Sequence, residues 1–160
     1  MNIYAFFLVT VVALSGTAAS GQTASTHEQN AMHVMGFSQT ATTHHFELTY
    51  DGGVIDVRAN DVKDLETRAQ IRSHFQHIAK MFADGDFNAP MLVHGVNVPG
   101  TSTMTRLKDQ LHWDLQETPR GARIVITADN QVALNAVHDF LRFQIEDHKT
   151  GDCEVVRPAA

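Results

Sequence analysis

Histidine is the residue type in this chain whose abundance most directly suggests chemistry. Ten of the 160 residues are histidines, whereas Cys153 is the only cysteine. A single cysteine excludes an intrachain disulfide and any multi-cysteine zinc or iron–sulfur site. The sequence also lacks the Cys-x-x-Cys-His motif that attaches c-type haem. Metal chemistry in this protein would therefore use imidazole ligands, with methionine thioethers as a second type of donor.

Three histidines are expected to face the interior of the fold from three different elements. His44 alternates in phase with Phe46 and Leu48 along a predicted strand. His74 borders the apolar stripe of one predicted helix, and His138 lies on the apolar stripe of the last one. If both helices cover the same side of the sheet, the three imidazoles converge. Three imidazoles with one open position suit copper, zinc or another first-row metal ion.

Two further groups are candidate ligands. His94 is a candidate fourth ligand, because it follows Pro90-Met91 in a long connection without clear secondary structure, where functional residues are common. Met32, His33 and Met35 form a softer cluster that would suit Cu(I), or that serves as an apolar anchor. We expect copper first, with zinc or haem iron as the other metals. For His138 the alternative is a core histidine that hydrogen bonds to a backbone carbonyl.

Two other functions remain open. Two axial histidines, or one histidine and one methionine, could hold a b-type haem. Four phenylalanines would then line its slot, although they equally make an ordinary core: Phe75, Phe82, Phe140 and Phe143. The second alternative is a small-molecule or interaction domain in which the histidines are structural. The chain has no Gly-x-Ser-x-Gly, His-Glu-x-x-His or phosphate-loop motif, which favours binding over catalysis.

Charge and hydropathy limit the partners. The formal net charge of −6 argues against a nucleic-acid binder, which would carry a basic face. The apolar run Ile3–Leu14, followed by small residues up to Ser20, is typical of a signal peptide. It is shorter than the about 20 residues of a membrane-spanning helix. We therefore expect a periplasmic or secreted protein without a membrane span in its mature form. Its expected partner is a metal ion or a small molecule. A second copy of the chain, in a homodimer, is a further candidate partner.

The periodicity of the sequence predicts two β-hairpins, each followed by a helix. The order ββαββα most simply gives an α+β two-layer sandwich, ferredoxin-like or similar, with two helices on one face of an antiparallel sheet. The expected segments are strand 43–50, a turn at Asp51-Gly52-Gly53, strand 54–57, helix 61–83, an irregular connection 84–100 with a short strand at 91–94, helical turns at 103–110, strands 111–116 and 123–128, and helix 131–148.

The chain divides into four expected parts. These are a signal peptide at 1–20, an N-terminal arm at 21–42, the α+β domain at 43–152 and a C-terminal tail at 153–160. The length that follows the signal peptide suits one domain with one hydrophobic core.

Several motifs resemble those of a family of small exported bacterial proteins. The motifs cover most of the expected mature chain: Met-Gly-Phe-x-Gln at 35–39, Thr-Thr-His-His-Phe at 42–46, Gly-Asp-Phe-x-Ala-Pro at 85–90, the helix segment 136–145, and His-Lys-Thr-Gly-Asp at 148–152. Proteins similar to these sometimes carry the name aspartate carbamoyltransferase. Carbamoyltransferases resemble one another in a Ser-Thr-Arg-Thr phosphate loop on a longer, two-domain chain. The nearest string here, Ser102–Arg106, breaks that order, so the resemblance implies an exported protein and no particular reaction.

Overall fold

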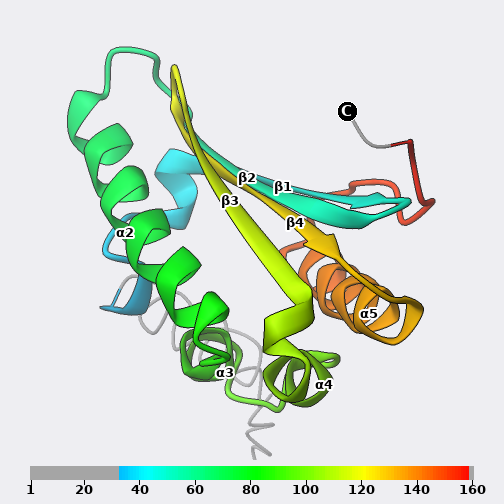
Figure 1. Ribbon diagram of the computed structural model, residues 1–160. Coiled ribbons are helices and arrows are strands. Elements are labelled where there is room, and N and C mark those ends of the chain that lie inside the picture. Colours follow the sequence, from blue (N-terminus) through cyan, green and yellow to red (C-terminus); the bar gives the residue numbers. More distant parts are fainter. Residues whose placement is uncertain (1–32, 159–160) are drawn as a thin grey trace, which may run out of the picture.

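The architecture is a four-stranded antiparallel sheet with helices packed on one side (Figure 1). The computed structural model describes residues 33–158, so the predicted signal peptide lies outside the described residues. The strands run in the order β1-β2-β4-β3. Their bounds are β1 Thr42–Thr49, β2 Gly52–Ala59, β3 Leu111–Thr118 and β4 Gly121–Ala128.

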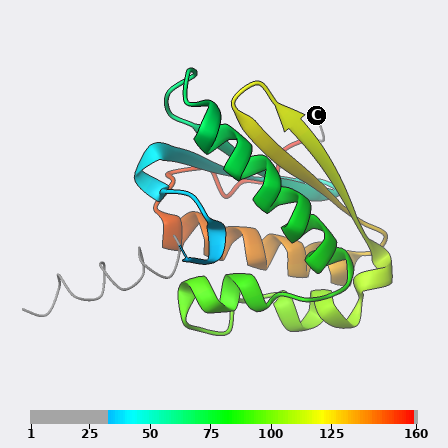
Figure 2. The same ribbon diagram turned by 90° about the vertical axis from the view of Figure 1, so that its left-hand side faces the viewer.

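In the part of the chain that the structure describes, four α-helices pack on one side of the sheet. They are α2 Leu65–Ala83, α3 Asn88–His94, α4 Thr101–Arg106 and α5 Gln131–His148, with short 3-10 turns at Gln39–Ala41 and Lys108–Gln110. The two long helices, α2 and α5, cross the inner face of the sheet, and α3 and α4 close the layer at one end (Figure 2). Within residues 33–158, no helix is both long and apolar enough to cross a membrane.

The predicted class is confirmed, while the predicted order of elements is too simple. The protein is α+β with an antiparallel sheet, and its long helices share one layer. Between α2 and β3, however, the chain adds α3 and α4. A ferredoxin-like chain follows the order βαββαβ, whereas here two hairpins meet through their second strands, β2 and β4. The fold is therefore a two-layer sandwich of a different connectivity.

The prediction of a short strand at Met91–His94 was wrong, because this segment lies in helix α3. Pro90 is compatible with that helix, since it lies in the first turn, where the missing N–H would have no intrahelical partner. Gly95 ends the helix in the left-handed conformation, with φ of 69°. The apolar residues around Pro90 are too few to show whether their spacing is that of a helix or of a strand. The helix becomes evident only in the structure, where Ala89 and Val93 are buried.

The glycines of the first hairpin have a different role from the one expected. The two-residue turn consists of Tyr50 and Asp51, because Thr49 pairs with Gly52. Gly52 and Gly53 instead belong to β2, where a Cβ atom would collide with the carbonyl oxygen of Ile126 and with the Leu141 side chain respectively. These glycines therefore permit close approach of β4 and of helix α5 to the hairpin.

Helix α5 is bounded as predicted, and His138 fastens it to the same hairpin. The Asn130 side chain caps the helix by accepting from the backbone N–H groups of Val132 and Ala133. The buried His138 Nε2 lies 2.9 Å from the carbonyl oxygen of Thr49 and 3.0 Å from that of Gly52. Because both neighbours are acceptors, Nε2 carries the proton and donates it. The core-histidine alternative for His138 is thus confirmed.

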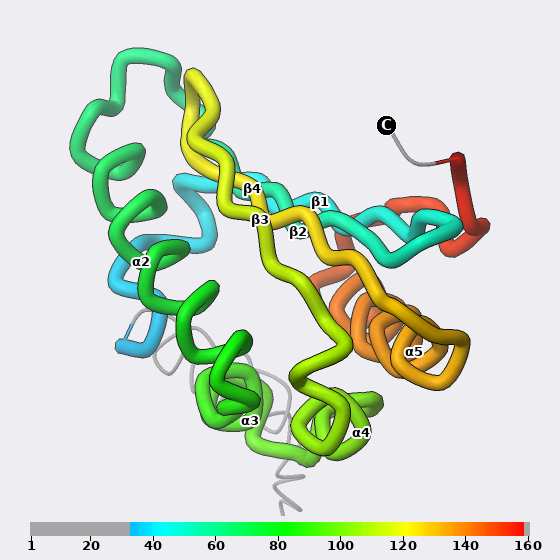
Figure 3. Tube along the Cα trace, viewed as in Figure 1, coloured from blue at the N-terminus to red at the C-terminus, as the bar shows by residue number. Residues whose placement is uncertain are grey.

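The end of the described chain returns to the outer edge of the sheet. The Asp152 carboxylate accepts hydrogen bonds from the Phe46 backbone N–H at 2.9 Å and lies 3.0 Å from His45 Nδ1. Further along, Arg157 forms backbone hydrogen bonds with Leu48 and Tyr50. The segment therefore covers part of the exposed edge of β1, beside the cyan hairpin in Figure 3.

The hydrogen bonds of His138 predict the effect of replacing it. The variant His138→Phe keeps an aromatic ring but leaves two buried carbonyl groups without their donor. We expect the free energy of unfolding to fall by about 1–3 kcal/mol, measured by urea denaturation. His112→Ala, which changes an exposed strand residue, should stay within about 0.5 kcal/mol of the wild type. Equal stability of His138→Phe and wild type would show that this contact does not hold α5.

Candidate metal and ligand site

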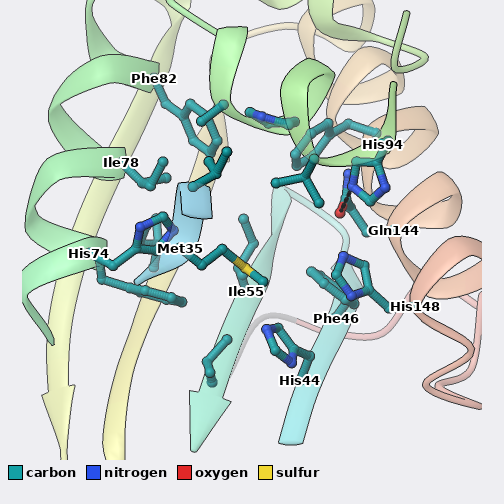
Figure 4. Close-up of a pocket in the computed structure, with 18 of the residues that line it drawn as sticks. Met35, His44, Phe46, Ile55, His74, Ile78, Phe82, His94, Gln144 and His148 are labelled. Carbon is teal, nitrogen blue, oxygen red and sulfur yellow. Dashed lines mark hydrogen bonds between the residues drawn. The ribbon is translucent and has the colours of Figure 1, made fainter. Parts of the chain in front are cut away.

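One apolar cavity lies between the inner face of the sheet and helices α2, α3 and α5 (Figure 4). Its volume is about 80 Å³. Its wall is mostly aliphatic and aromatic, and it includes Phe46, Ile55, Ile78 and Phe82. Four histidines also line it: His44, His74, His94 and His148. The cavity is therefore where the imidazoles of this protein gather.

Both ring nitrogens of His94 lie within hydrogen-bond distance of side-chain oxygen atoms. It is the last residue of α3, and only 2% of its side chain is exposed. Its Nδ1 lies 2.7 Å from Asp147 Oδ2, and its Nε2 lies 3.1 Å from Gln144 Oε1. The Phe143 ring packs edge-on against the imidazole, with the centroids 5.1 Å apart. The Asp147 carboxylate at Nδ1 and the Gln144 amide oxygen at Nε2 together fix the orientation of the ring.

His148 connects His94 to His44. The His148 ring packs edge-on against His94 at 5.2 Å between centroids and stacks on His44 at 5.1 Å. His94, Asp147 and His148 each offer a potential ligand atom, and these atoms all lie within 4.8 Å of one another. Ligands of one tetrahedral ion with bonds of about 2.0–2.1 Å lie about 3.3 Å apart. To coordinate one ion, the ligand atoms that lie farthest apart would therefore have to approach each other by little more than an ångström.

The ends of two helices meet at this group. His94 ends α3 and His148 ends α5. Carbonyl groups at a helix C-terminus carry partial negative charge, which stabilises a nearby cation. The Asp147 carboxylate adds a full negative charge. The electrostatic environment thus favours a positive ion between the two helices.

His44 and His74 occupy more apolar surroundings. Burial, and to a smaller extent the neighbouring His45, lowers the pKa of His44 from 6.5 to about 4. Burial also lowers the pKa of His74 to about 4, with smaller effects of His77 and His44. The Phe37 ring contacts both imidazoles, with ring centroids 6.2 Å from His44 and 5.6 Å from His74. Because both pKa values lie well below 7, both imidazoles are neutral at pH 7.

The structure brings together some of the sequence candidates and separates others. His44, His74 and His94 line the same cavity, whereas His138 is outside its lining and donates its Nε2 proton to the β1–β2 turn. The expected convergence of His44, His74 and His138 therefore does not occur. From the softer cluster, Met35 lines the cavity and His33 is exposed. Met32 lies outside the described residues.

Sequence reasoning missed His148, Asp147 and Gln144. His148 shares a helix face with His138, but it lies about 15 Å further along the axis, so it was excluded as a partner of His138. The available signal was Gln144, a polar residue beside the apolar stripe of α5 that is buried at 5% exposure. The contact of α5 with the end of α3 is a tertiary feature that no local pattern encodes.

The apolar cavity also bears on the haem alternative. Phe75, Phe82 and Phe140 line it, whereas Phe143 contacts His94 without lining it. Pockets for drug-sized ligands have volumes of about 300–1,000 Å³, and a porphyrin is at least that large. A cavity of about 80 Å³ accommodates an ion or a small molecule far more readily than a macrocycle.

Comparison of the chain with protein-family models, with curated proteins and with solved structures found no match. The resemblance to small exported bacterial proteins therefore stays a prediction. The geometry of the site is therefore what indicates a function for this protein.

The lowered pKa values predict how stability depends on pH. Between pH 6.5 and about 4, the unfolded chain protonates His44 and His74 while the folded chain does not. Stability therefore falls as the pH falls through this window, by at most about 1.4 kcal/mol per pH unit for each imidazole. Urea denaturation at several pH values should show this slope, and His74→Phe should reduce it. His112→Ala is the matched control and should keep the slope, whereas an unchanged slope in His74→Phe would contradict the assignment.

Proposed function

We propose that this protein binds a first-row transition metal ion through His94, His148 and Asp147. The observation that carries the proposal is the grouping of these three ligand atoms within 4.8 Å at the C-terminal ends of two helices. Two histidines and one carboxylate are a common ligand set for catalytic zinc and for non-haem iron, with positions left for other ligands. The donor types alone therefore do not select the metal.

The surroundings of the group favour copper. Divalent copper binds most nitrogen and oxygen sites more tightly than the other first-row ions. Met35 lines the same cavity, so a thioether donor that suits Cu(I) is on its wall. His44 stacks on His148 and offers a further neutral imidazole. Copper thus remains the first candidate, with zinc as the second.

Metal titration of the full chain tests the proposal. We expect one equivalent of Cu²⁺ to bind in isothermal titration calorimetry, with elemental analysis after dialysis as the second measurement. His148→Ala removes one imidazole and should abolish stoichiometric binding. Asp147→Asn keeps the size of the side chain but removes its charge, and should weaken the affinity by about 10–100-fold.

The chain offers a matched control for these variants. His112 Nε2 lies 2.9 Å from Asp129 Oδ1 on the exposed part of the surface, so it is also an imidazole–carboxylate pair. His112→Ala should leave copper binding unchanged. If His112→Ala and His148→Ala weakened binding equally, the metal would bind to surface histidines and the proposal would fail.

We also propose that the protein is exported to the periplasm or beyond. The support is the apolar run Ile3–Leu14 and the small residues that follow it. Mass spectrometry of the protein recovered from outside the cytoplasm should show an N-terminus between about residues 19 and 25. Recovery of chains that still begin at Met1 would contradict cleavage.

A further inference from the structure

The part of the cavity beyond His94 and His148 has an apolar wall that the metal proposal does not use. Ile55, Phe75, Ile78 and Phe82 contribute to this wall from the sheet and helix α2. A cavity needs about 10–15 Å³ to hold one water molecule, and this one has about 80 Å³. It is therefore several times larger than a single water requires.

The opposite wall carries two buried polar atoms without hydrogen-bond partners. These are His44 Nε2, on β1, and Gln144 Nε2, on α5. Both residues line the cavity, and Figure 4 shows them on the side where His94 and His148 lie, facing His74 and Ile78 across the cavity. Buried donors and acceptors without partners are unfavourable and uncommon in folded proteins. Their position at one cavity indicates that a ligand supplies the missing partners.

The chemistry of the two walls defines the ligand. An ionised group would lose its hydration against the apolar wall without gaining a counter-charge there, so the ligand is neutral. The phenylalanines favour an aromatic body, because aromatic rings gain from offset and edge-on contacts. A hydroxyl group can both donate and accept a hydrogen bond, so it can pair with His44 Nε2 in either tautomer.

We propose that the cavity binds a neutral monocyclic phenol, with its ring against Ile78 and Phe82 and its hydroxyl group at His44 Nε2. This inference goes beyond the proposed metal site and does not require a metal ion. It makes the protein a receptor for small aromatic alcohols at a cavity that adjoins the histidine group.

Methyl NMR of the full chain, in the presence of a chelator, tests the inference with phenol and toluene as probes. These molecules have nearly the same size, and only phenol has a hydroxyl group. We expect saturable shifts at the methyl groups of Ile55 and Ile78. Ile71, which is also buried but does not line the cavity, should not shift. Phenol should bind about two- to tenfold more tightly than toluene, which corresponds to one net hydrogen bond.

Two variants make the test specific. His44→Phe preserves a flat ring but removes Nε2, so the ratio of phenol to toluene affinity should fall to about one. Ala89→Leu enlarges a side chain of the cavity wall and should weaken both probes by at least about tenfold, since the cavity volume is small. This second variant keeps the inference testable if His44→Phe does not fold.

Each outcome is decisive. No saturable shift up to the solubility of phenol, equal shifts at Ile71, or an unchanged affinity ratio in His44→Phe would overturn the inference. Phenol binding without copper binding would refute the metal site and leave the phenol site standing. Copper binding without phenol binding would refute only the phenol site.

Discussion

The close packing of helix α5 against the β1–β2 hairpin is the constraint on which the rest of this structure depends. Gly53 has no Cβ atom where Leu141 approaches, and His138 donates to the carbonyl groups on both sides of the turn. Ten residues of helix span about 15 Å from His138 to His148, and five residues of strand span about 17 Å from Thr49 to His44. Because the two lengths nearly match, fastening His138 at the turn places His148 against His44.

The same packing gives the site its electrostatic character. With α5 in this position, Gln144 and Asp147 reach His94 at the end of α3, so two helix C-termini and a carboxylate surround the imidazoles. On the other side, the apolar wall removes water from His44 and His74 and lowers their pKa values to about 4. The protein thus places an anionic group, at Asp147 and the two helix C-termini, on one side of these histidines and a neutral, apolar wall on the other.

The alternation and helical periods of the sequence determined most of the fold. They predicted both hairpins and the full extent of α5, because these elements carry a regular inner face and Asn130 caps the last helix. They did not resolve α3, whose seven residues are too few to show a period. They also assigned Gly52 and Gly53 to the turn, because the sequence cannot distinguish a glycine needed for positive φ from one needed for close approach.

For the site, the sequence by itself determined the chemistry of the donors. The abundance of histidine and the single cysteine predicted imidazole ligands with thioethers as a second type of donor, and strand parity correctly turned His44 toward the helices. Only the tertiary structure decided which imidazoles meet. His138 and His148 share one helix face and are equivalent by periodicity, yet one faces the backbone carbonyls of a turn and the other faces His44 and His94. The difference arises because residues on one helix face can lie many ångströms apart along the axis. Each residue therefore contacts a different part of the neighbouring elements.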